Sequence, residues 1–236
     1  MNRNPSRGPQ KSLLFRVVAF FSRLQLRYLL QTMGNPRFLV VIFVFIAGAT
    51  ALGIITIAAY LTKLPLLFPP LGPSAFILFH TPMSVTASPR NVILSHTLAV
   101  AVGLLSLWFV GTIYPEANLS DPSVINLYRV MVIALSMGLV GVTMVIARCA
   151  HPPAAASTLI AAMGYLTDIT KVLGLIGAVV LLVLNAFFFN RILGGLPYPV
   201  WRADPNVSRS YGLLAGIPDA DTTFWQQLTA KIFQRR

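Results

Sequence analysis

Four long apolar runs constrain this chain more than any other feature of its sequence. They cover residues 38–61, 92–113, 127–147 and 172–189. A helix of roughly 20 apolar residues is long enough to cross the roughly 30 Å of hydrocarbon in a bilayer. The runs therefore predict four membrane-spanning helices in an integral membrane protein.

The scarcity of charged side chains supports the same class. Hydrophobic residues make up 56% of the 236 positions and charged residues only 10%, against about 25% in a typical soluble domain. So few charges cannot cover a soluble protein of this length with a polar surface. A soluble fold is therefore excluded.

The net charge of +12 is concentrated at the two ends of the chain. Residues 1–37 hold seven basic groups and no acid, residues 38–190 hold five basic and three acidic groups, and residues 191–236 hold six basic and three acidic groups. Basic flanks beside apolar spans are typical of the positive-inside bias and of contact with anionic lipids. We expect a bilayer with anionic lipids as a partner, and no nucleic acid.

Two tails flank a membrane domain that we place at residues 38–193. In the N-terminal tail, 1–37, residues 12–32 predict a basic amphipathic helix that lies in the membrane interface. The alternatives are an organelle transit peptide and a helix packed on the core. The C-terminal tail, 194–236, predicts a short helix with an apolar stripe that docks on the membrane or on a neighbour. The stripe consists of Trp225, Leu228 and Ile232.

Two shorter apolar segments, 65–83 and 151–166, lie between the long runs, and a proline pair opens the helix predicted in each. Pro-Pro-Leu-Gly-Pro-Ser at 69–74 aligns with Pro-Pro-Ala-Ala-Ala-Ser at 152–157, an offset of 83 residues. The chain therefore predicts an all-α polytopic membrane protein built as two copies of one unit. Each unit is a long span, a short helix begun by Pro-Pro, and a second long span, a design used by many transport proteins.

The positive-inside bias favours six crossings, with both termini in the cytoplasm, over four spans and two re-entrant helices. With six crossings, the arginines at the span ends fall on the same side as the basic tails, and the acidic loop 111–126 falls on the other side. The arginines are Arg90, Arg148 and Arg191. Lys63, Asp168 and Lys171 also fall on that other side, so the bias is imperfect. Four long spans plus two re-entrant helices remain the alternative.

The starts of the two short helices predict an anion site. Pro69, Pro70, Pro152 and Pro153 suit a first helical turn, where proline's missing N–H has no partner to lose. A helix start leaves free amides and about half a positive charge. The small Gly72 and Ala155 let an ion approach the backbone, and two hydroxyls add donors. The hydroxyls belong to Ser74 and Ser157.

Basic and polar groups flank both helix starts and favour a small anion over a cation. Arg148 and His151 lie beside the second start, and Arg90, Asn91 and His96 follow the first short helix. Ionisable groups inside a membrane are functional candidates. The alternative for both arginines is a role as anchors at the membrane edge. The alternative for His96 is a neutral ring bonded to a backbone carbonyl.

Metal and disulfide chemistry find no support in the sequence. Cys149 is the only cysteine, so no intrachain disulfide forms, and the histidines lie far apart without any metal-ligand spacing. We expect no metal and no cofactor. Since only six acidic residues exist and none lies in a motif, we also do not expect an enzyme.

Three motifs in the same order resemble the HPP family of integral membrane proteins. They are RCAHPPAAASTLIAAMG at 148–164, PLGPSAFILF at 70–79 followed by SPRNVILSH at 88–96, and NRILGGLPYPVW at 190–201. The resemblance covers roughly residues 36–201 and implies a membrane protein of about four helices. Ala155 stands where the family pattern leads us to expect glycine, and its methyl group is expected to narrow the site.

The resemblance also implies a substrate, because plant chloroplast and cyanobacterial members are associated with nitrite transport. We therefore expect a transporter or channel for a small monovalent anion, nitrite first, in a bacterial inner membrane. A chloroplast envelope is the alternative location, and a homo-oligomer is a further expectation. The alternative functions are a structural or regulatory membrane subunit without transport and, behind it, a membrane-embedded enzyme.

Overall fold

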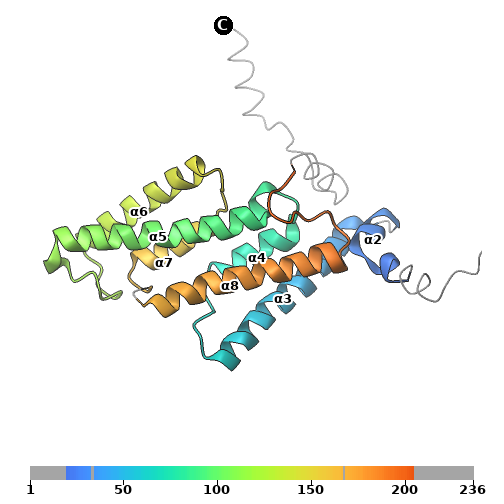
Figure 1. The fold of residues 1–236 in the computed structure, drawn as a ribbon, viewed down its shortest axis with the longest axis horizontal. Helices are drawn as coiled ribbons and strands as arrows, with labels where there is room; N and C mark the ends of the chain where they lie inside the picture. The colour runs from blue at the N-terminus through green and yellow to red at the C-terminus, as the bar shows by residue number, and fades with distance from the viewer. Residues whose placement is uncertain (1–19, 33–34, 167, 205–236) are drawn as a thin grey trace, which may run out of the picture.

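The computed structural model describes residues 20–32, 35–166 and 168–204, and these residues form helices joined by loops (Figure 1). The predicted C-terminal stripe and most of the basic N-terminal tail lie outside them. The principal elements are α2 (Leu26–Thr32), α3 (Pro36–Thr62), α4 (Leu71–His80), α5 (Pro89–Ile113), α6 (Leu127–Ile146), α7 (Ala154–Ala162) and α8 (Ile169–Phe187). The short helices η1 (Val85–Ala87) and η2 (Pro115–Ala117) precede and follow α5, and a π-helical segment, η3 (Phe188–Leu193), extends α8.

The four predicted spans are confirmed as the long apolar helices α3, α5, α6 and α8 with η3. Their starts lie up to three residues before the apolar runs because capping residues set them. The side chains of Asn35, Asn126 and Asp168 accept from backbone amides in the first turns of α3, α6 and α8. Such caps satisfy amides that have no partner inside the helix. At the other end of α3, Lys63 adopts a left-handed φ of 59° and ends the helix.

The expectation of six complete helical crossings is corrected by the lengths of the short helices. α4 has 10 residues and α7 has 9, so at about 1.5 Å per residue each extends for roughly half of the hydrocarbon thickness. A non-helical stretch precedes each of them, at 63–70 and 147–153. The prolines of these stretches interrupt the helical hydrogen bonding that a complete span would need.

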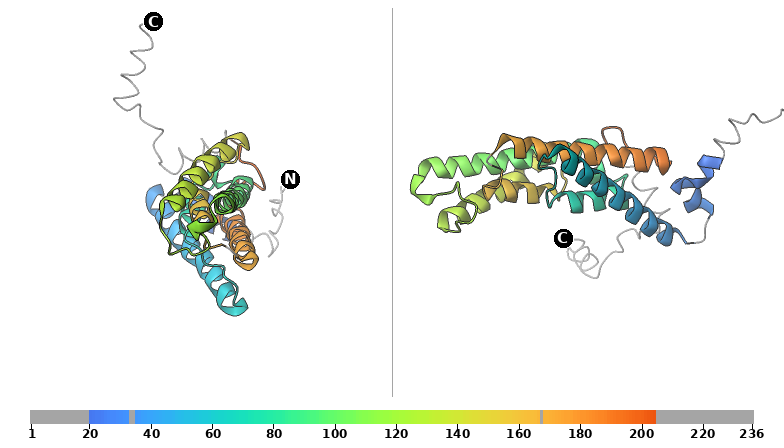
Figure 2. Two further views of the ribbon diagram at one scale, coloured as in Figure 1. Left: turned by 90° about the vertical axis from the view of Figure 1, so that its left-hand side faces the viewer. Right: turned by 90° about the horizontal axis from the view of Figure 1, so that it is seen from below.

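The two half-length helices run in opposite directions. α4 starts near the centre of the molecule and runs toward the end where α2 lies and α5 begins, whereas α7 runs from the centre toward the opposite end (Figures 1 and 2). The order of long, half-length and long helix thus occurs twice, as the sequence repeat predicts. The N-termini of α4 and α7 face each other across the middle of the molecule.

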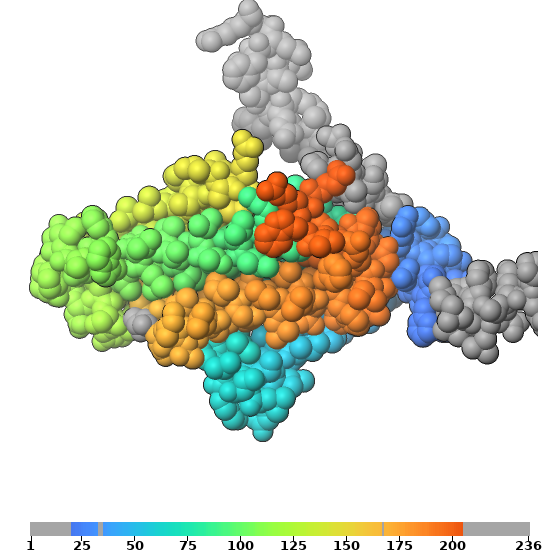
Figure 3. All heavy atoms as spheres, in the orientation of Figure 1, coloured from blue at the N-terminus to red at the C-terminus, as the bar shows by residue number. Residues whose placement is uncertain are grey.

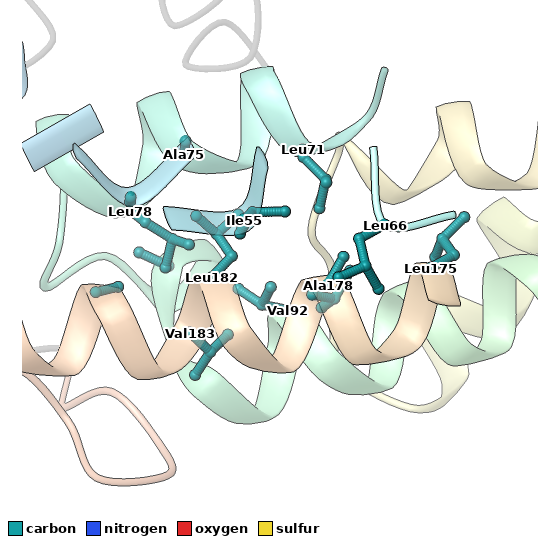
Figure 4. Close-up of a cluster of buried hydrophobic side chains, with 14 of the residues drawn as sticks. Ile55, Leu66, Leu71, Ala75, Leu78, Val92, Leu175, Ala178, Leu182 and Val183 are labelled. Atoms are coloured by element: carbon teal, nitrogen blue, oxygen red, sulfur yellow. The ribbon is translucent and has the colours of Figure 1, made fainter. Parts of the chain in front are cut away.

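Apolar side chains of α3, α4, α5 and α8 pack together around α4 (Figure 4). Ile55 of α3, Leu78 of α4 and Leu182 of α8 are fully buried there. Small residues let the helices approach, which matters in a membrane because lipid provides little hydrophobic drive for helix association. One close approach is between α5 and α7, where Gly103 lies against the backbone of Thr158 and the methyl group of Ala161. Figure 2 shows α3 inclined away from the other long helices.

The segment after α8 closes one end of the molecule and lies across α8 and the start of α5 (Figure 3). The hydroxyl of Tyr198 donates to the Ala87 carbonyl at 2.9 Å, and the Arg90 amide donates to the Trp201 carbonyl at 3.0 Å. Burial raises the pKa of Tyr198, so its hydroxyl stays protonated and remains a donor.

α2 docks on the same end. Its Leu26 and Leu30 pack with Val40, Met83 and Leu196, and the Arg27 amide donates to the Gly194 carbonyl at 2.9 Å. The described part of the amphipathic segment therefore packs on the membrane domain, which agrees with the alternative of a helix packed on the core. Its other apolar side chains face outward, where the interfacial interpretation remains a prediction. They are Phe20, Phe21, Leu24 and Tyr28.

Candidate functional site

Four polar side chains meet where the half-length helices begin. Ser74 comes from α4, His96 from α5, Ser157 from α7 and His151 from the segment just before α7. All four are 0% exposed. We call these residues the His–Ser cluster.

The cluster forms an unbroken chain of hydrogen bonds. Nε2 of His96 lies 3.1 Å from Oγ of Ser74, and Nδ1 of His96 lies 2.8 Å from Oγ of Ser157. His151 places Nε2 2.9 Å from Oγ of Ser74 and Nδ1 2.8 Å from the carbonyl oxygen of Thr86. The ring centroids of the two histidines are 5.3 Å apart. The hydroxyl of Ser74 thus links the two imidazoles.

The sequence repeat explains why both serines reach His96. Ser74 is the fourth residue of α4 and Ser157 is the fourth residue of α7. Because the two helices begin at the centre from opposite sides, equivalent positions in the repeat converge on one point. α5 then places His96 between the two hydroxyls.

Arg90, Asn91 and Ser95 of α5 hold the backbone of the segment that precedes α7. The Arg90 guanidinium donates from Nη1 to the Arg148 carbonyl at 2.7 Å and from Nη2 to the Ala147 carbonyl at 2.9 Å. Asn91 donates to the Ala150 carbonyl at 3.5 Å, and Ser95 donates to the Cys149 carbonyl. Arg90 and Asn91 were predicted to face the anion; in the structure their side chains bind carbonyls and fix the position of His151.

Three further predicted site residues lie at the edge of the site or outside it. Arg148 is exposed and adopts a left-handed φ of 49°. Gly72 is exposed, and a Cβ added there would meet nothing within 4 Å. Ala155 is half-buried inside the regular helix α7, so its methyl group requires no unusual backbone conformation.

The expectation of bare amides at the two helix starts is wrong. The amides of Leu71, Gly72 and Ser74 donate to the carbonyls of Phe68, Pro69 and Pro70, and the amides of Ala154, Ala155 and Ala156 donate to those of His151, Pro152 and Pro153. The physical reason is that each proline pair lies in a turn, so carbonyls outside the helix reach the first amides. Pro70 and Pro153 are the N-cap residues. The polar groups at the centre are therefore side chains, and the backbone contributes through the helix dipoles.

The Thr86 carbonyl determines which cluster atom donates each proton. A carbonyl only accepts, so Nδ1 of His151 must be protonated. In a neutral His151, Nε2 then accepts from the Ser74 hydroxyl, and the oxygen of Ser74 accepts from Nε2 of His96. Nδ1 of His96 in turn accepts from the Ser157 hydroxyl. The chain of donors runs in one direction, from Ser157 to Thr86.

We expect nitrogen-15 NMR of the histidine-labelled protein to show opposite tautomers for the two buried rings. At neutral pH, His96 carries its proton on Nε2 and His151 carries its proton on Nδ1, because the Thr86 carbonyl fixes the direction of the chain. Signals are assigned with His96→Gln and His151→Gln. The same tautomer for both rings would contradict this assignment.

Arg129 is the buried charged residue that the sequence analysis did not single out. It lies in the first turn of α6 and is 1% exposed. Its guanidinium donates to the carbonyls of Leu119, Asp121, Val124 and Ala162 at 2.8–3.3 Å. Since Ala162 is the last residue of α7, this arginine caps the half-length helix at the end away from the cluster. An arginine in the first turn of an apolar span was the available signal.

Residues of the described chain form no group of three or more His, Cys, Asp or Glu side chains that could hold a metal ion. A sequence profile described as HPP, transmembrane region, matches residues 33–199. The chain belongs to the HPP family. The matched region of this HPP protein contains all four long spans, both half-length helices and the whole His–Ser cluster. No curated protein and no solved structure matches the chain.

Proposed function

We propose that this HPP protein is a transporter or channel for a small monovalent anion, with nitrite as the first candidate, and that the ion passes at the His–Ser cluster. The observation that carries the proposal is the meeting of two half-length helices, N-terminus to N-terminus, on four side chains that can donate hydrogen bonds. Each helix N-terminus contributes about half a positive charge. Transporters commonly place such helix ends at the substrate.

The distribution of acidic groups favours an anion over a cation. The acidic residues of the described chain lie in the segments that connect the long helices or follow them, namely Glu116, Asp121, Asp168 and Asp204. The cluster itself consists of neutral donors. A cation would find no carboxylate among these four side chains, whereas an anion would meet hydroxyl and imidazole protons.

The cluster is closed in this conformation, since its four side chains are fully buried and bond to one another. An entering ion would exchange these bonds for its own. Two buried hydroxyls without a partner among the described residues lie on the helices around it, Thr158 Oγ1 on α7 and Ser106 Oγ on α5. Buried polar groups without partners are rare, and these two could bind an ion or water that leaves the cluster along α5.

We further propose a bacterial inner membrane as the location, with both termini in the cytoplasm. The starts of α3 and α5 and the end of α8 lie at the end of the molecule where α2 is docked (Figure 1). That end carries Arg37, Arg90 and Arg191. At the opposite helix ends, the basic Lys63, Arg129 and Lys171 are balanced by the acidic Glu116, Asp121 and Asp168, so the basic excess lies at the α2 end. The positive-inside bias then assigns the α2 end to the cytoplasm.

The test is nitrite flux into liposomes that contain the purified full-length protein. We expect uptake above that of protein-free liposomes, and a reduction on the order of tenfold for Ser74→Ala, because loss of about 1.4 kcal/mol of hydrogen bonding corresponds to a factor of ten. The matched control is Ser136→Ala, since Ser136 is equally buried but bonds to the Ile133 carbonyl of its own helix.

Flux through Ser136→Ala should match that of the unmodified protein. If nitrite, nitrate, formate and chloride all fail to exceed the protein-free rate, transport is wrong, and a structural or regulatory membrane subunit becomes the better interpretation. Equal flux through Ser74→Ala and the unmodified protein would remove the cluster from the pathway.

A further inference from the structure

We propose that the anion crosses together with one proton carried by the His–Ser cluster, so that this HPP protein is a proton–anion symporter. The inference rests on the proposed transport function and adds its driving force. The direction of the hydrogen-bond chain and the positions of the fixed charges around the cluster support it.

The chain has two possible directions, and the protonation state of His151 selects between them. In the neutral state the donors run from Ser157 through His96 and Ser74 to His151, whose Nδ1 donates to Thr86. When His151 is a cation, Nε2 also carries a proton and must donate to the oxygen of Ser74. The hydroxyl of Ser74 then points to Nε2 of His96, and Nδ1 of His96 donates to Ser157.

One added proton converts the first state into the second without any net rearrangement of heavy atoms. A proton that reaches the oxygen of Ser157 releases the hydroxyl proton of Ser157 to Nδ1 of His96. His96 releases its Nε2 proton to the oxygen of Ser74, and Ser74 releases its hydroxyl proton to Nε2 of His151. One proton has entered, each atom has its normal valence, and the positive charge resides on His151.

The same step changes what Ser157 offers to a ligand. In the neutral state the hydroxyl of Ser157 donates its hydrogen bond to Nδ1 of His96, so Ser157 can offer a ligand only its oxygen lone pairs. In the protonated state Ser157 accepts a hydrogen bond from His96, and its own hydroxyl proton stays on the oxygen and is available to donate to a ligand. An anion requires a donor, and it is therefore bound best by the protonated cluster, where it also meets the positive charge of His151.

Among the described residues, no lysine or arginine side chain hydrogen-bonds to the cluster. Arg90 binds two backbone carbonyls of the segment before α7, and Arg129 caps the far end of α7. Lys171 lies in the first turn of α8, Arg148 is exposed, and Arg191 donates to the Tyr198 carbonyl. The other titratable groups on the surrounding elements are Arg37 and Tyr60 of α3, Lys63 at the C-cap of α3, His80 of α4, Tyr128 of α6, and Cys149, whose side chain is buried in the segment that precedes α7.

A buried anion needs a compensating positive charge, because the free energy of transferring an unpaired ion from water into a low-dielectric interior is large and unfavourable. The starts of α4 and α7 contribute partial positive charges, but a helix dipole carries no net charge, because its other end is equally negative. Within the described residues, the contacts of the cluster supply a full positive charge only through its own histidines. The occupied site is then an ion pair of net charge zero. Transport of a monovalent anion with one proton moves no net charge across the membrane.

The experiment compares the effects of voltage and pH on nitrite uptake into proteoliposomes, with the passive uptake of protein-free liposomes subtracted. At zero potential we expect the initial rate to rise several-fold, up to about tenfold, when the outside is made more acidic by one pH unit, because the protonated fraction of a neutral site grows tenfold per unit. A potential of 100 mV, worth about 2.3 kcal/mol for one charge, should leave the rate unchanged.

His151→Gln tests the assigned carrier. A glutamine amide can donate to Thr86 and accept from Ser74, so it imitates the neutral ring but takes up no proton. We expect the pH response to disappear in this variant and to persist in His80→Gln, which changes a histidine outside the cluster. A pH response retained by His151→Gln would overturn the role of His151.

The outcomes separate the two proposals. Nitrite uptake that responds to voltage and ignores the pH gradient would overturn the symport and leave the transport function intact. Absence of uptake under every gradient would overturn both. The comparison of voltage and pH uses the unmodified protein, so it remains decisive even if His151→Gln does not fold.

Discussion

The variant Arg129→Met is expected to lower the free energy of unfolding by about 4 kcal/mol. The guanidinium binds four carbonyls, of Leu119, Asp121, Val124 and Ala162. A hydrogen bond to a charged group contributes about 1.5–3 kcal/mol, and the carbonyls left inside the protein would lose their partner. Methionine keeps the unbranched apolar stem of the side chain and supplies no donor.

The measurement is unfolding in mixed detergent micelles with increasing SDS, followed by circular dichroism. The stability of Arg129→Lys should lie between that of Arg129→Met and that of the unmodified protein, because an ammonium group has three donors and lacks the planar fork of a guanidinium. The matched control is Arg148→Met, which changes an exposed arginine and should alter stability by less than about 0.5 kcal/mol. Equal stability of Arg129→Met and the unmodified protein would show that the carbonyls find other partners.

The second large effect is expected at the contact between α5 and α7. A Cβ at position 103 would lie 2.6 Å from the Ala161 Cβ and 2.6 Å from the Thr158 carbonyl oxygen. Neither atom belongs to the flexible end of a side chain, so Gly103→Ala must push the helices apart. Overpacking of this kind lowers stability by about 1–3 kcal/mol. Because Thr158 adjoins Ser157, the same shift should also reduce nitrite flux.

Gly141→Ala provides a control that should not lower stability. A Cβ at this position of α6 would meet nothing within 4 Å, and alanine is a better helix former than glycine by up to about 1 kcal/mol. The SDS unfolding transition should stay the same or move to higher SDS for Gly141→Ala, and to lower SDS for Gly103→Ala. A loss of stability in both variants would indicate a general intolerance of methyl groups rather than the close contact.

The fold could largely be predicted from the sequence, because long apolar runs and proline pairs constrain a chain locally. The spans, the family and the two short helices all follow from residues adjacent in sequence. The lengths of the short helices were harder to predict, since the apolar character of 65–83 and 151–166 continues well beyond the helical turns. The N-caps of the long helices required side-chain geometry.

The residues that form the candidate site could be predicted from the sequence, but many of their contacts could not. Ser74, His96, His151 and Ser157 were selected from the sequence, and the structure brings them together. The contacts of Arg90 and Arg129 could not be predicted, because a guanidinium that binds carbonyls from distant loops leaves no periodic pattern. The same limit applies to the helix-start amides, whose partners depend on the turn at each proline pair.

The serines of the cluster occupy equivalent positions in the two repeat units, whereas the histidines do not. Shifting by the 83-residue offset pairs Ser74 with Ser157, but it pairs His96 with Val179 and His151 with Phe68. Two halves with opposite directions therefore enclose an asymmetric centre, because each imidazole is supplied by only one of them. An ion arriving from one face of the membrane meets a different first partner from an ion arriving from the other face, so inward and outward passage need not be equally fast.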